Sequence, residues 1–453
     1  MTYAYIFYFS SFIASLINPF WGLVGLVVSV LIRFQDRYPD IVSIKPFSLL
    51  FMGMIIGCFI HREKLAQQEW RQDKLLLGLL IISILGLLVM NRGQLISQTW
   101  EFISAIAFYF FATRILQEPR QFVILFAFMS CCIVFMGYEA IQHIALYPET
   151  SHFLDERNGR WQGLGYYKNA NEFGQLMSTT LPFLFAALLI KNNIIIKSVV
   201  IGIIAVLIFV IGKSESRTVM VLVGVMVVLT IILRRPGNII MKTIKGAIIG
   251  VLLLIGLSYA PGPIQDRLES VLDAGSDKSF QGRTRSWEQG FDMISWYPIT
   301  GVGKGQWSEY HGLRPHNSYV EIMAELGIFG IILFLMILKL SYQEFKPFFM
   351  DPEDSPNDDK NAQDRPFYKA PKADENTTSE KTATAIVIPE ETKTIVIAVA
   401  IVYTCWLMYI FLGNQAYSVW TYFYIGLCGA VRNLLPEELK NANQSTYQYT
   451  KYS

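Results

Sequence analysis

Long apolar segments alternate with short polar segments along most of the chain. A helix needs roughly 20 mostly apolar residues to cross the hydrocarbon core of a bilayer, and runs of about that length recur throughout. Near the N-terminus, residues 3–34 are predicted to form either one span or a tight pair of helices, with an interruption at Asn18–Pro19. The predicted fold is an all-α, polytopic transmembrane bundle of about twelve helices. The other predicted spans lie near residues 42–60, 74–91, 98–116, 120–145, 170–190, 195–212, 217–234, 243–260, 316–341, 394–414 and 416–433.

One polar segment that interrupts this pattern, residues 342–393, is rich in Pro, Asp, Glu, Lys and Thr. It holds few large apolar side chains, so it cannot bury enough surface to offset the entropy lost on ordering. We expect a disordered insert on the cytoplasmic side of the membrane.

A second polar segment, residues 261–315, contains several aromatic residues and predicts a folded subdomain. Trp287, Phe291 and Ile294 recur at spacings of four and three, as on one face of a helix. This helix should end before Pro298 and should pack Trp287 and Phe291 towards the bundle.

The predicted organisation follows from these two segments. We expect an N-terminal bundle, the folded subdomain, one helix, the insert, two further helices and a cytoplasmic tail. Their predicted ranges are 1–260, 261–315, 316–341, 342–393, 394–433 and 434–453.

Composition supports a membrane protein and excludes other classes. Hydrophobic residues make up 53% and charged residues 16% of the chain, whereas soluble domains carry about 25% charge. A net charge of +2 gives no reason to expect a nucleic-acid partner. The five cysteines lie inside apolar runs, which predicts neither disulfides nor a metal site.

The orientation follows from Lys and Arg in short loops, which favour the cytoplasmic side. If residues 261–315 lie outside, the inner loops hold twelve such residues and the outer loops nine. The bias is small, and it places residues 261–315 in the periplasm and both termini in the cytoplasm.

The most informative polar group lies where the second segment meets the span near 316–341. His316 begins that span, and a neutral imidazole there can accept a proton near pH 7. The alternative is an interfacial histidine that only caps the helix together with Asn317. Arg283 and Arg285 lie upstream; being two residues apart, they leave different helix faces, and only one is expected to bind a given phosphate.

Two more polar patches are predicted on the same side. Residues 212–219 form a short hinge in which Arg217 either faces a cavity or pairs with Glu215. Residues 157–172 mix basic and aromatic side chains, which bind sugar and phosphate or form an interfacial belt. A glycine-rich segment, residues 300–305, lacks the pattern of a phosphate-binding loop and predicts a tight turn.

Several short motifs follow one another along the chain. They are Asn171-Glu172 before Pro182, Ser216-Arg217-Thr218, Gly282-Arg283-Thr284 with Trp287, Pro298 to Gly303, His316-Asn317-Ser-Tyr319 and Glu325-Leu-Gly327. In this order and spacing they resemble the O-antigen ligase and Wzy-type polymerase superfamily. Pro19-Phe-Trp-Gly22 near the N-terminus is similar to the exosortase A-associated O-glycosylation ligases within that superfamily.

The resemblance implies glycan transfer at the periplasmic face of the bacterial inner membrane, without a metal or other cofactor. The donor would be a glycan linked to undecaprenyl diphosphate. The acceptor hydroxyl would belong to a glycan, a lipid A core or a protein Ser or Thr. By position, His316 would be the base and Arg217 and Arg283 would hold the diphosphate. The further substrate-binding candidates are Arg285, Arg160, Lys168, Asn171, Trp287, Asn317 and Arg314.

A lipid-linked oligosaccharide flippase or another secondary transporter is the alternative, because it has a similar helix count and can hold the same substrate with arginines. No inverted repeat is evident between the two halves, and the polar residues gather at one face. The two functions are distinguished by whether His316, Arg217 and Arg283 converge on one cavity.

Overall fold

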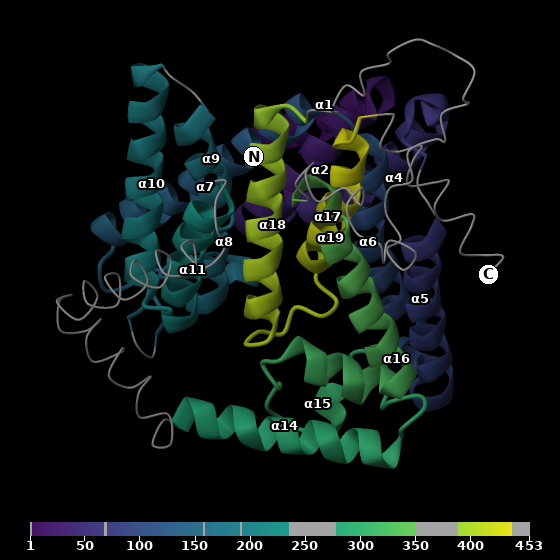
Figure 1. Cartoon of the computed structure of the whole chain (residues 1–453). Helices are drawn as coiled ribbons and strands as arrows, with labels where there is room; N and C mark the ends of the chain where they lie inside the picture. The colour runs from purple at the N-terminus through teal and green to yellow at the C-terminus, as the bar shows by residue number, and fades with distance from the viewer. Residues whose placement is uncertain are drawn as a thin grey trace, which may run out of the picture.

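The computed structural model describes residues 2–67, 70–156, 159–190, 193–234, 278–349 and 388–436. These residues are almost wholly helical, and their only β-type pairing is an isolated bridge between Leu154 and Trp161 (Figure 1). Within them, nine helical segments are long and apolar enough to cross a membrane. The prediction of an all-α, polytopic membrane protein is confirmed.

The N-terminal stretch forms two helices, α1 (Thr2–Ile17) and α2 (Pro19–Ile32). The side chain of Asn18 accepts a hydrogen bond from the backbone N–H of Phe20 at 3.0 Å, so it caps α2. Pro19 stands at the first helical position, where its missing N–H is not needed. The expected interruption at Asn18–Pro19 is therefore a turn between a tight pair of helices.

The rest of the bundle follows the predicted apolar runs closely. Its helices are α3 (Phe34–Arg37), α4 (Pro46–Ile60), α5 (Trp70–Met90), α6 (Leu95–Ile115), α7 (Pro119–Leu146), α8 (Ala170–Ser178), α9 (Leu181–Ile190), α10 (Ile194–Ser214), α11 (Arg217–Arg234), α16 (Ser318–Gln343), α17 (Lys346–Phe349), α18 (Glu390–Ile410) and α19 (Val419–Val431). The predicted span near 170–190 is divided into α8 and α9. The predicted span near 243–260 lies outside the described residues.

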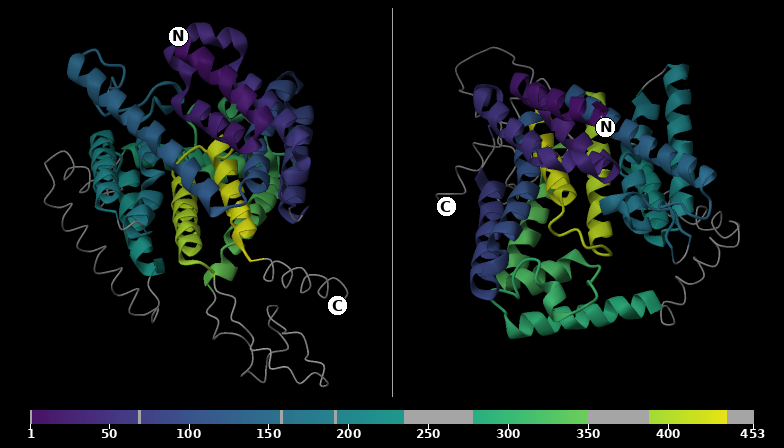
Figure 2. Two further views of the ribbon diagram at one scale, coloured as in Figure 1. Left: turned by 90° about the horizontal axis from the view of Figure 1, so that it is seen from above. Right: turned by 180° about the vertical axis from the view of Figure 1, so that it is seen from behind.

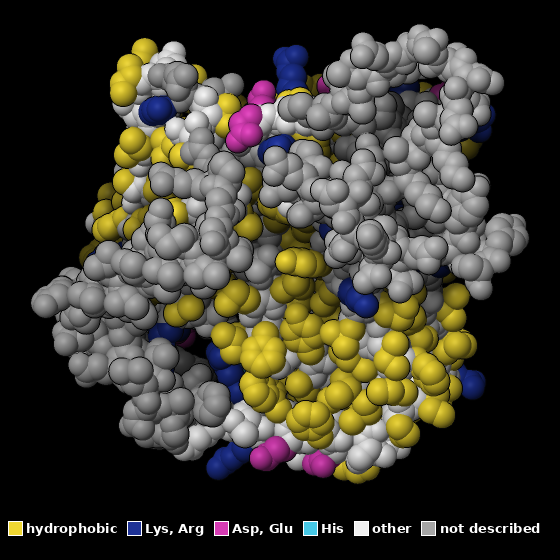
Figure 3. Space-filling model, in the orientation of Figure 1, with side chains coloured by type: hydrophobic (Ala, Val, Ile, Leu, Met, Phe, Trp, Pro, Cys, Tyr) yellow, Lys and Arg dark blue, Asp and Glu magenta, His cyan; other side chains and the backbone are white. Residues whose placement is uncertain are grey.

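The core of the bundle is built around α19, which packs most extensively on α6. Gly426 allows this approach, because a Cβ atom there would lie 2.8 Å from Cα of Tyr109. Figure 3 shows a broad apolar surface on one face of the molecule. On α16 the side chains of Ile328, Phe329 and Ile332 are exposed, as expected for a helix that faces lipid.

The predicted subdomain is described from residue 278 onwards and contains α14 (Lys278–Trp296) and α15 (Trp307–Tyr310). Figures 1 and 2 show α14 lying across one end of the bundle, at a steep angle to the spanning helices. We call this end the loop end. α14 stops before Pro298, as predicted, and residues 261–277 lie outside the described part of the chain.

The expectation that Phe291 packs towards the bundle is wrong, since its side chain is 55% exposed. The buried face of α14 instead runs through Ser286, Gly290 and Met293. Gly290 sets this face, because a Cβ atom there would lie 2.5 Å from Cγ1 of Val320 on α16. Because the backbone of α14 at Gly290 lies against the side chain of Val320, the next residue, Phe291, points outwards.

Only the edges of the predicted insert are described. Residues 342–349 continue α16 into α17, and Ile388 packs in the core just before α18. Residues 350–387 lie outside the described residues, as do residues 437–453 of the predicted tail.

Candidate functional site

His316 lies at the loop end, in the residue before the cap of α16. Its backbone φ is +48°, a left-handed conformation that turns the chain sharply into the helix. The side chain of Asn317 accepts hydrogen bonds from the backbone N–H groups of Tyr319 and Val320, at 3.0 and 3.2 Å. Asn317 therefore caps α16 by itself, and the imidazole of His316 is left for other contacts.

Two arginines lie close enough to His316 for their charges to act on it. Burial lowers the pKa of His316 below its ordinary value, and the positive charges of Arg283 and then Arg314 lower it further. The imidazole is consequently neutral at pH 7, with a lone pair available to accept a proton.

The two arginines of α14 differ as expected from their spacing. Arg283 is half-buried, whereas Arg285 is exposed to solvent on another face of the helix. Arg283 also lies near Tyr409, at the end of α18. Of the two, only Arg283 is placed with His316.

Trp287 joins α14 to the chain just before His316. Its indole Nε1 donates a hydrogen bond to the carbonyl oxygen of Pro315 at 2.8 Å. Its ring packs edge-on against Phe411, with centroids 5.8 Å apart. Because Pro315 directly precedes His316, this hydrogen bond fixes the backbone next to His316 relative to α14.

The loop between α18 and α19 approaches the site from the opposite side. Asn414 places Nδ2 3.4 Å from Nδ1 of His316. The next residue, Gln415, donates from Nε2 to Oε1 of Glu172 at 3.4 Å. Glu172 stands in the first turn of α8, close enough to Arg314 for the two charges to interact. Two consecutive loop residues thus connect His316 with α8.

Two buried oxygen atoms beside this group have no hydrogen-bond partner within the described residues. They are Oδ1 of Asn414 and Oε2 of Glu321, and Glu321 lies within reach of the charge of Arg314. Buried polar atoms are nearly always hydrogen-bonded in folded proteins. Either atom can accept a hydrogen bond from a polar ligand or from water.

The two patches predicted around residues 157–172 and 212–219 meet each other on α8. Arg160 donates from Nε to the carbonyl oxygen of Ser214 and from Nη2 to Oδ1 of Asn171, both at 2.9 Å. Arg217 is the first residue of α11 and belongs to the same hinge. The chain turns there at Glu215, whose backbone has a left-handed conformation. Arg157 lies outside the described residues.

The predicted site residues therefore fall into two groups, which lie beside two neighbouring residues of α8, Glu172 and Asn171. His316, Arg283 and Arg314 lie on the side of Glu172, whereas Arg160 and the hinge of Arg217 lie beside Asn171. Lys168 is exposed, and its charge acts on His152 in the loop after α7.

The predicted turn near 300–305 is confirmed, and it is anchored by a buried carboxylate. Glu325 accepts hydrogen bonds from the backbone N–H groups of Gly305 and Trp307, at 2.7 and 3.1 Å. Lys304 is 1% exposed and donates from Nζ to Oε1 of Gln98 at 2.7 Å. Burial lowers the pKa of Lys304, and the nearby carboxylates oppose that change.

Gly327 explains how α16 accommodates this turn. Its φ is +70°, and a Cβ atom there would lie 2.5 Å from the carbonyl oxygen of Ile299. The backbone of Ile328 donates to the carbonyl oxygen of Pro298 at 2.9 Å. The Glu325-Leu-Gly327 motif thus fastens the loop that carries the site to the membrane helix.

We expect Glu325→Ala to destabilise the fold strongly. The substitution leaves two buried N–H groups without their acceptor and removes a carboxylate near the buried ammonium of Lys304. Leaving a buried hydrogen-bond donor without its acceptor costs about 1–3 kcal/mol. Size-exclusion chromatography of heated, detergent-solubilised protein measures the change as a lower midpoint of unfolding.

Glu325→Gln is the matched control, because its amide oxygen can still accept a hydrogen bond from the backbone N–H groups of Gly305 and Trp307 while the negative charge is removed. It should unfold at a higher temperature than Glu325→Ala. Equal midpoints for Glu325→Ala and the wild type would show that this carboxylate does not anchor the loop.

Comparison with known proteins connects the site to a family. A family model described as O-antigen ligase (Wzy_C) matches residues 200–335, which include Arg217, Arg283 and His316. The chain is also 25% identical over 219 residues to an exopolysaccharide production protein, ExoQ, of Rhizobium meliloti (strain 1021). That alignment covers 43% of this chain and 48% of ExoQ, so it spans about half the length of the relative. The resemblance seen in the sequence motifs is confirmed.

Proposed function

We propose that this chain, a member of the O-antigen ligase and Wzy-type superfamily, moves a glycan from an undecaprenyl-diphosphate donor to an acceptor hydroxyl. The reaction takes place at the loop end of the bundle, which faces the periplasm in this proposal. Family membership supports glycan transfer by a membrane enzyme, and the local geometry supports the assignment of residues.

The grouping of a neutral His316 with Arg283 and Arg314 carries this proposal. The acceptor hydroxyl oxygen attacks the anomeric carbon of the donor sugar, and its proton passes to the imidazole of His316. The bond from that carbon to the phosphate oxygen breaks, and undecaprenyl diphosphate leaves with an additional negative charge. Guanidinium groups fixed beside the leaving group stabilise that charge as it develops.

Arg217 is the second diphosphate-binding residue of the proposal. It lies in the segment matched by the family model and begins α11 beside the hinge that Arg160 contacts. Arg160 and Asn171 are already hydrogen-bonded to each other, which pre-orients a cation and an amide for oxygen-rich ligands. We assign this second group to the donor.

The arrangement favours an enzyme over the transporter alternative. Transporters of the comparable helical type bind substrate near the middle of the bilayer, between internal repeats. Here His316, Arg283 and Arg314 gather at the loop end, where α14 and the loop between α18 and α19 meet, and Arg160 with the hinge of Arg217 forms a second group beside Asn171. Figure 3 shows Lys and Arg side chains near the loop end of the molecular surface.

The metal-free character of the reaction is tested by chelation. Purified protein in detergent should transfer glycan equally well with and without EDTA, since arginines supply the positive charge at the diphosphate. The product is quantified by mass spectrometry of the acceptor. Loss of transfer in EDTA, with recovery on adding a divalent cation, would contradict this part of the proposal.

A further inference from the structure

Four large aromatic or aliphatic side chains stand on the outside of the loop end, where α14 is followed by the glycine-rich turn and α15. They are Trp296, Tyr297, Ile299 and Tyr310, with exposed fractions of 57, 36, 64 and 37%. The ring centroid of Tyr310 lies 6.5 Å from that of Trp296 and 6.3 Å from that of Tyr297. We call these four residues the rim cluster. Exposed apolar side chains that adjoin one another mark a surface where a partner or a membrane binds.

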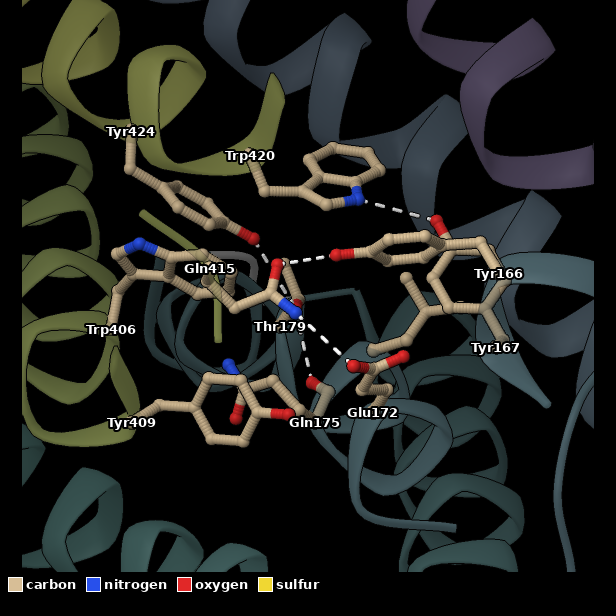
Figure 4. Close-up of a pocket in the computed structure, with 11 residues that line it drawn as sticks. Tyr166, Tyr167, Glu172, Gln175, Thr179, Trp406, Tyr409, Gln415, Trp420 and Tyr424 are labelled. Atoms are coloured by element: carbon tan, nitrogen blue, oxygen red, sulfur yellow. Dashed lines mark hydrogen bonds between the residues drawn. The ribbon is translucent and has the colours of Figure 1, made fainter. Parts of the chain in front are cut away.

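The aromatic side chains inside the bundle are arranged differently (Figure 4). Trp406, Trp420 and Tyr424 are buried between α8, α18 and α19. Trp406 and Tyr424 have ring centroids 4.7 Å apart, and the indole of Trp420 donates a hydrogen bond to Oη of Tyr167 at 3.2 Å. These interior rings cover one another, whereas the rings of the rim cluster turn part of their surface outwards.

Contacts with α16 place the rim cluster at the level where that helix enters the membrane. The backbone N–H of Ile328 donates to the carbonyl oxygen of Pro298, the residue between Tyr297 and Ile299. Ile328 and Phe329 are themselves exposed, and they begin the lipid-facing side of α16. The apolar surface of the rim cluster therefore continues into a surface that faces lipid.

Contacts with α5 indicate the same depth. The carbonyl oxygen of Thr300 lies against Gly86, since a Cβ atom added to that glycine would be 3.0 Å from it. The candidate span in α5, Arg71–Met90, holds 20 residues, about the number that a helix needs to cross the hydrocarbon core. Its last turn, which begins near Gly86, consequently lies at the membrane surface. Leu85 and Val89 beside that glycine are exposed, as expected for side chains that contact lipid.

The exposed surface of α14 changes its character at the rim cluster. Arg285, Glu288, Asp292 and Ser295 are exposed and recur at spacings of three and four, so they share one polar side of the helix. At Trp296 the exposed surface becomes aromatic. Trp and Tyr are enriched where a protein crosses from water to lipid. This change therefore marks the boundary between the two.

We propose that the rim cluster is a membrane-docking surface, and that its partner is the headgroup region of the adjoining lipid leaflet. The rings of Trp296, Tyr297 and Tyr310 suit that region, because each has an apolar body for acyl chains and an N–H or O–H group for headgroups and water. Ile299 contacts the acyl chains. The inference goes beyond the proposed function, since it concerns the position of the subdomain and requires no catalysis.

Docking has a consequence for the candidate site. Trp307 and Tyr310 belong to the same short helix, α15. The indole Nε1 of Trp307 donates to the carbonyl oxygen of Leu313 at 2.9 Å, in the chain that leads to His316. A rim cluster held in the headgroup region thus holds the His316 loop at a fixed depth relative to the membrane.

The fluorescence of Trp296 tests the docking in a bilayer. Wild-type protein and Trp296→Phe are placed in nanodiscs of phosphatidylethanolamine and phosphatidylglycerol, with or without bromine atoms on the acyl chains near the headgroups. The difference between the two emission spectra reports on Trp296, because the other tryptophans are common to both proteins. We expect brominated lipid to quench this difference severalfold more than iodide dissolved in the water. Quenching by iodide and not by brominated lipid would overturn the proposal.

Spin labels give a second measurement with a matched control. A nitroxide is attached at Ile299→Cys and, in a separate protein, at Glu288→Cys on the polar side of α14, both without the five native cysteines. Collisions with oxygen, which concentrates in lipid, should exceed those with a water-soluble nickel chelate severalfold at position 299. The order should reverse at position 288. Contact mainly with the nickel chelate at both positions would contradict docking.

The same labels distinguish lipid from a protein partner. A second copy of the chain seated on the rim cluster would bring two labels at position 299 together and broaden the spectrum of the fully labelled protein. It would also shield the label from oxygen and from the nickel chelate alike. That result would overturn the proposal, whereas a narrow spectrum with frequent oxygen collisions supports lipid as the occupant. The tryptophan measurement retains the native cysteines, so it decides the question even if the cysteine-free protein does not fold.

Discussion

Replacement of His316 by alanine should lower the rate of glycan transfer by roughly 10²- to 10⁴-fold, the usual contribution of a positioned general base. The backbone cap of α16 should survive, because Asn317 makes both capping hydrogen bonds. Donor binding should persist as well, since the arginines remain. The measurement is the initial rate of transfer by purified variants, with donor binding determined separately.

The pH dependence of the rate provides the control for this assignment. His316 has a lowered pKa, so the base should be lost only as the pH falls through a value below the ordinary one for histidine. Arg314→Ala removes a positive charge that disfavours the imidazolium, so the acidic limb should move to higher pH. An acidic limb that persists in His316→Ala would assign the proton transfer to another group.

Arg283→Lys should reduce transfer roughly 10- to 100-fold, because a charge-assisted hydrogen bond contributes about 1.5–3 kcal/mol and lysine cannot reproduce the guanidinium fork. Arg283 is half-buried beside His316, so its replacement changes the geometry at the leaving group. The rate is measured over a series of donor concentrations.

Arg285→Lys is the matched control, since it makes the same chemical change two residues away on an exposed face of α14. Its rate should stay within about twofold of the wild type, as surface charges interact weakly. Equal losses for the two variants would show that neither arginine has a specific place at the diphosphate.

The helices could be predicted from the sequence because the signals that set them are local. Apolar length placed the spans, and Asn18 with Pro19 marked a break that the structure shows as a capped turn. The orientation of Phe291 depended on a contact between Gly290 and Val320. The spacing of apolar residues within α14 does not reveal a contact with α16. The sequence therefore predicted the wrong orientation for Phe291.

Part of the grouping in the candidate site could be predicted from the sequence for the same reason. One short stretch of the sequence, residues 283–316, holds Arg283, Arg314 and His316. The structure places the two arginines close enough to His316 for their charges to act on it. Glu172 and Gln415 are 243 residues apart and become partners only when α8 meets the loop after α18. The polar break at Gly413, Asn414 and Gln415 between two apolar runs was the available signal.

The anchoring role of Glu325 was hidden for another reason. Glu325 lies in an apolar run. The two backbone N–H groups that donate hydrogen bonds to it belong to residues 20 and 18 positions earlier, in and just after the glycine-rich turn. A buried acid in a membrane helix signals function or structure without naming its partner. Only the fold showed that its partners are backbone groups.

The central claim is that His316 and the arginines catalyse transfer rather than transport. The most direct measurement is the amount of free undecaprenyl diphosphate and of glycosylated acceptor formed by purified protein in detergent, where no compartments exist. We predict equal amounts of the two products from the wild type and a strong reduction of both by His316→Ala. Intact donor and unmodified acceptor after incubation with wild-type protein that binds the donor would contradict the claim and favour a transporter.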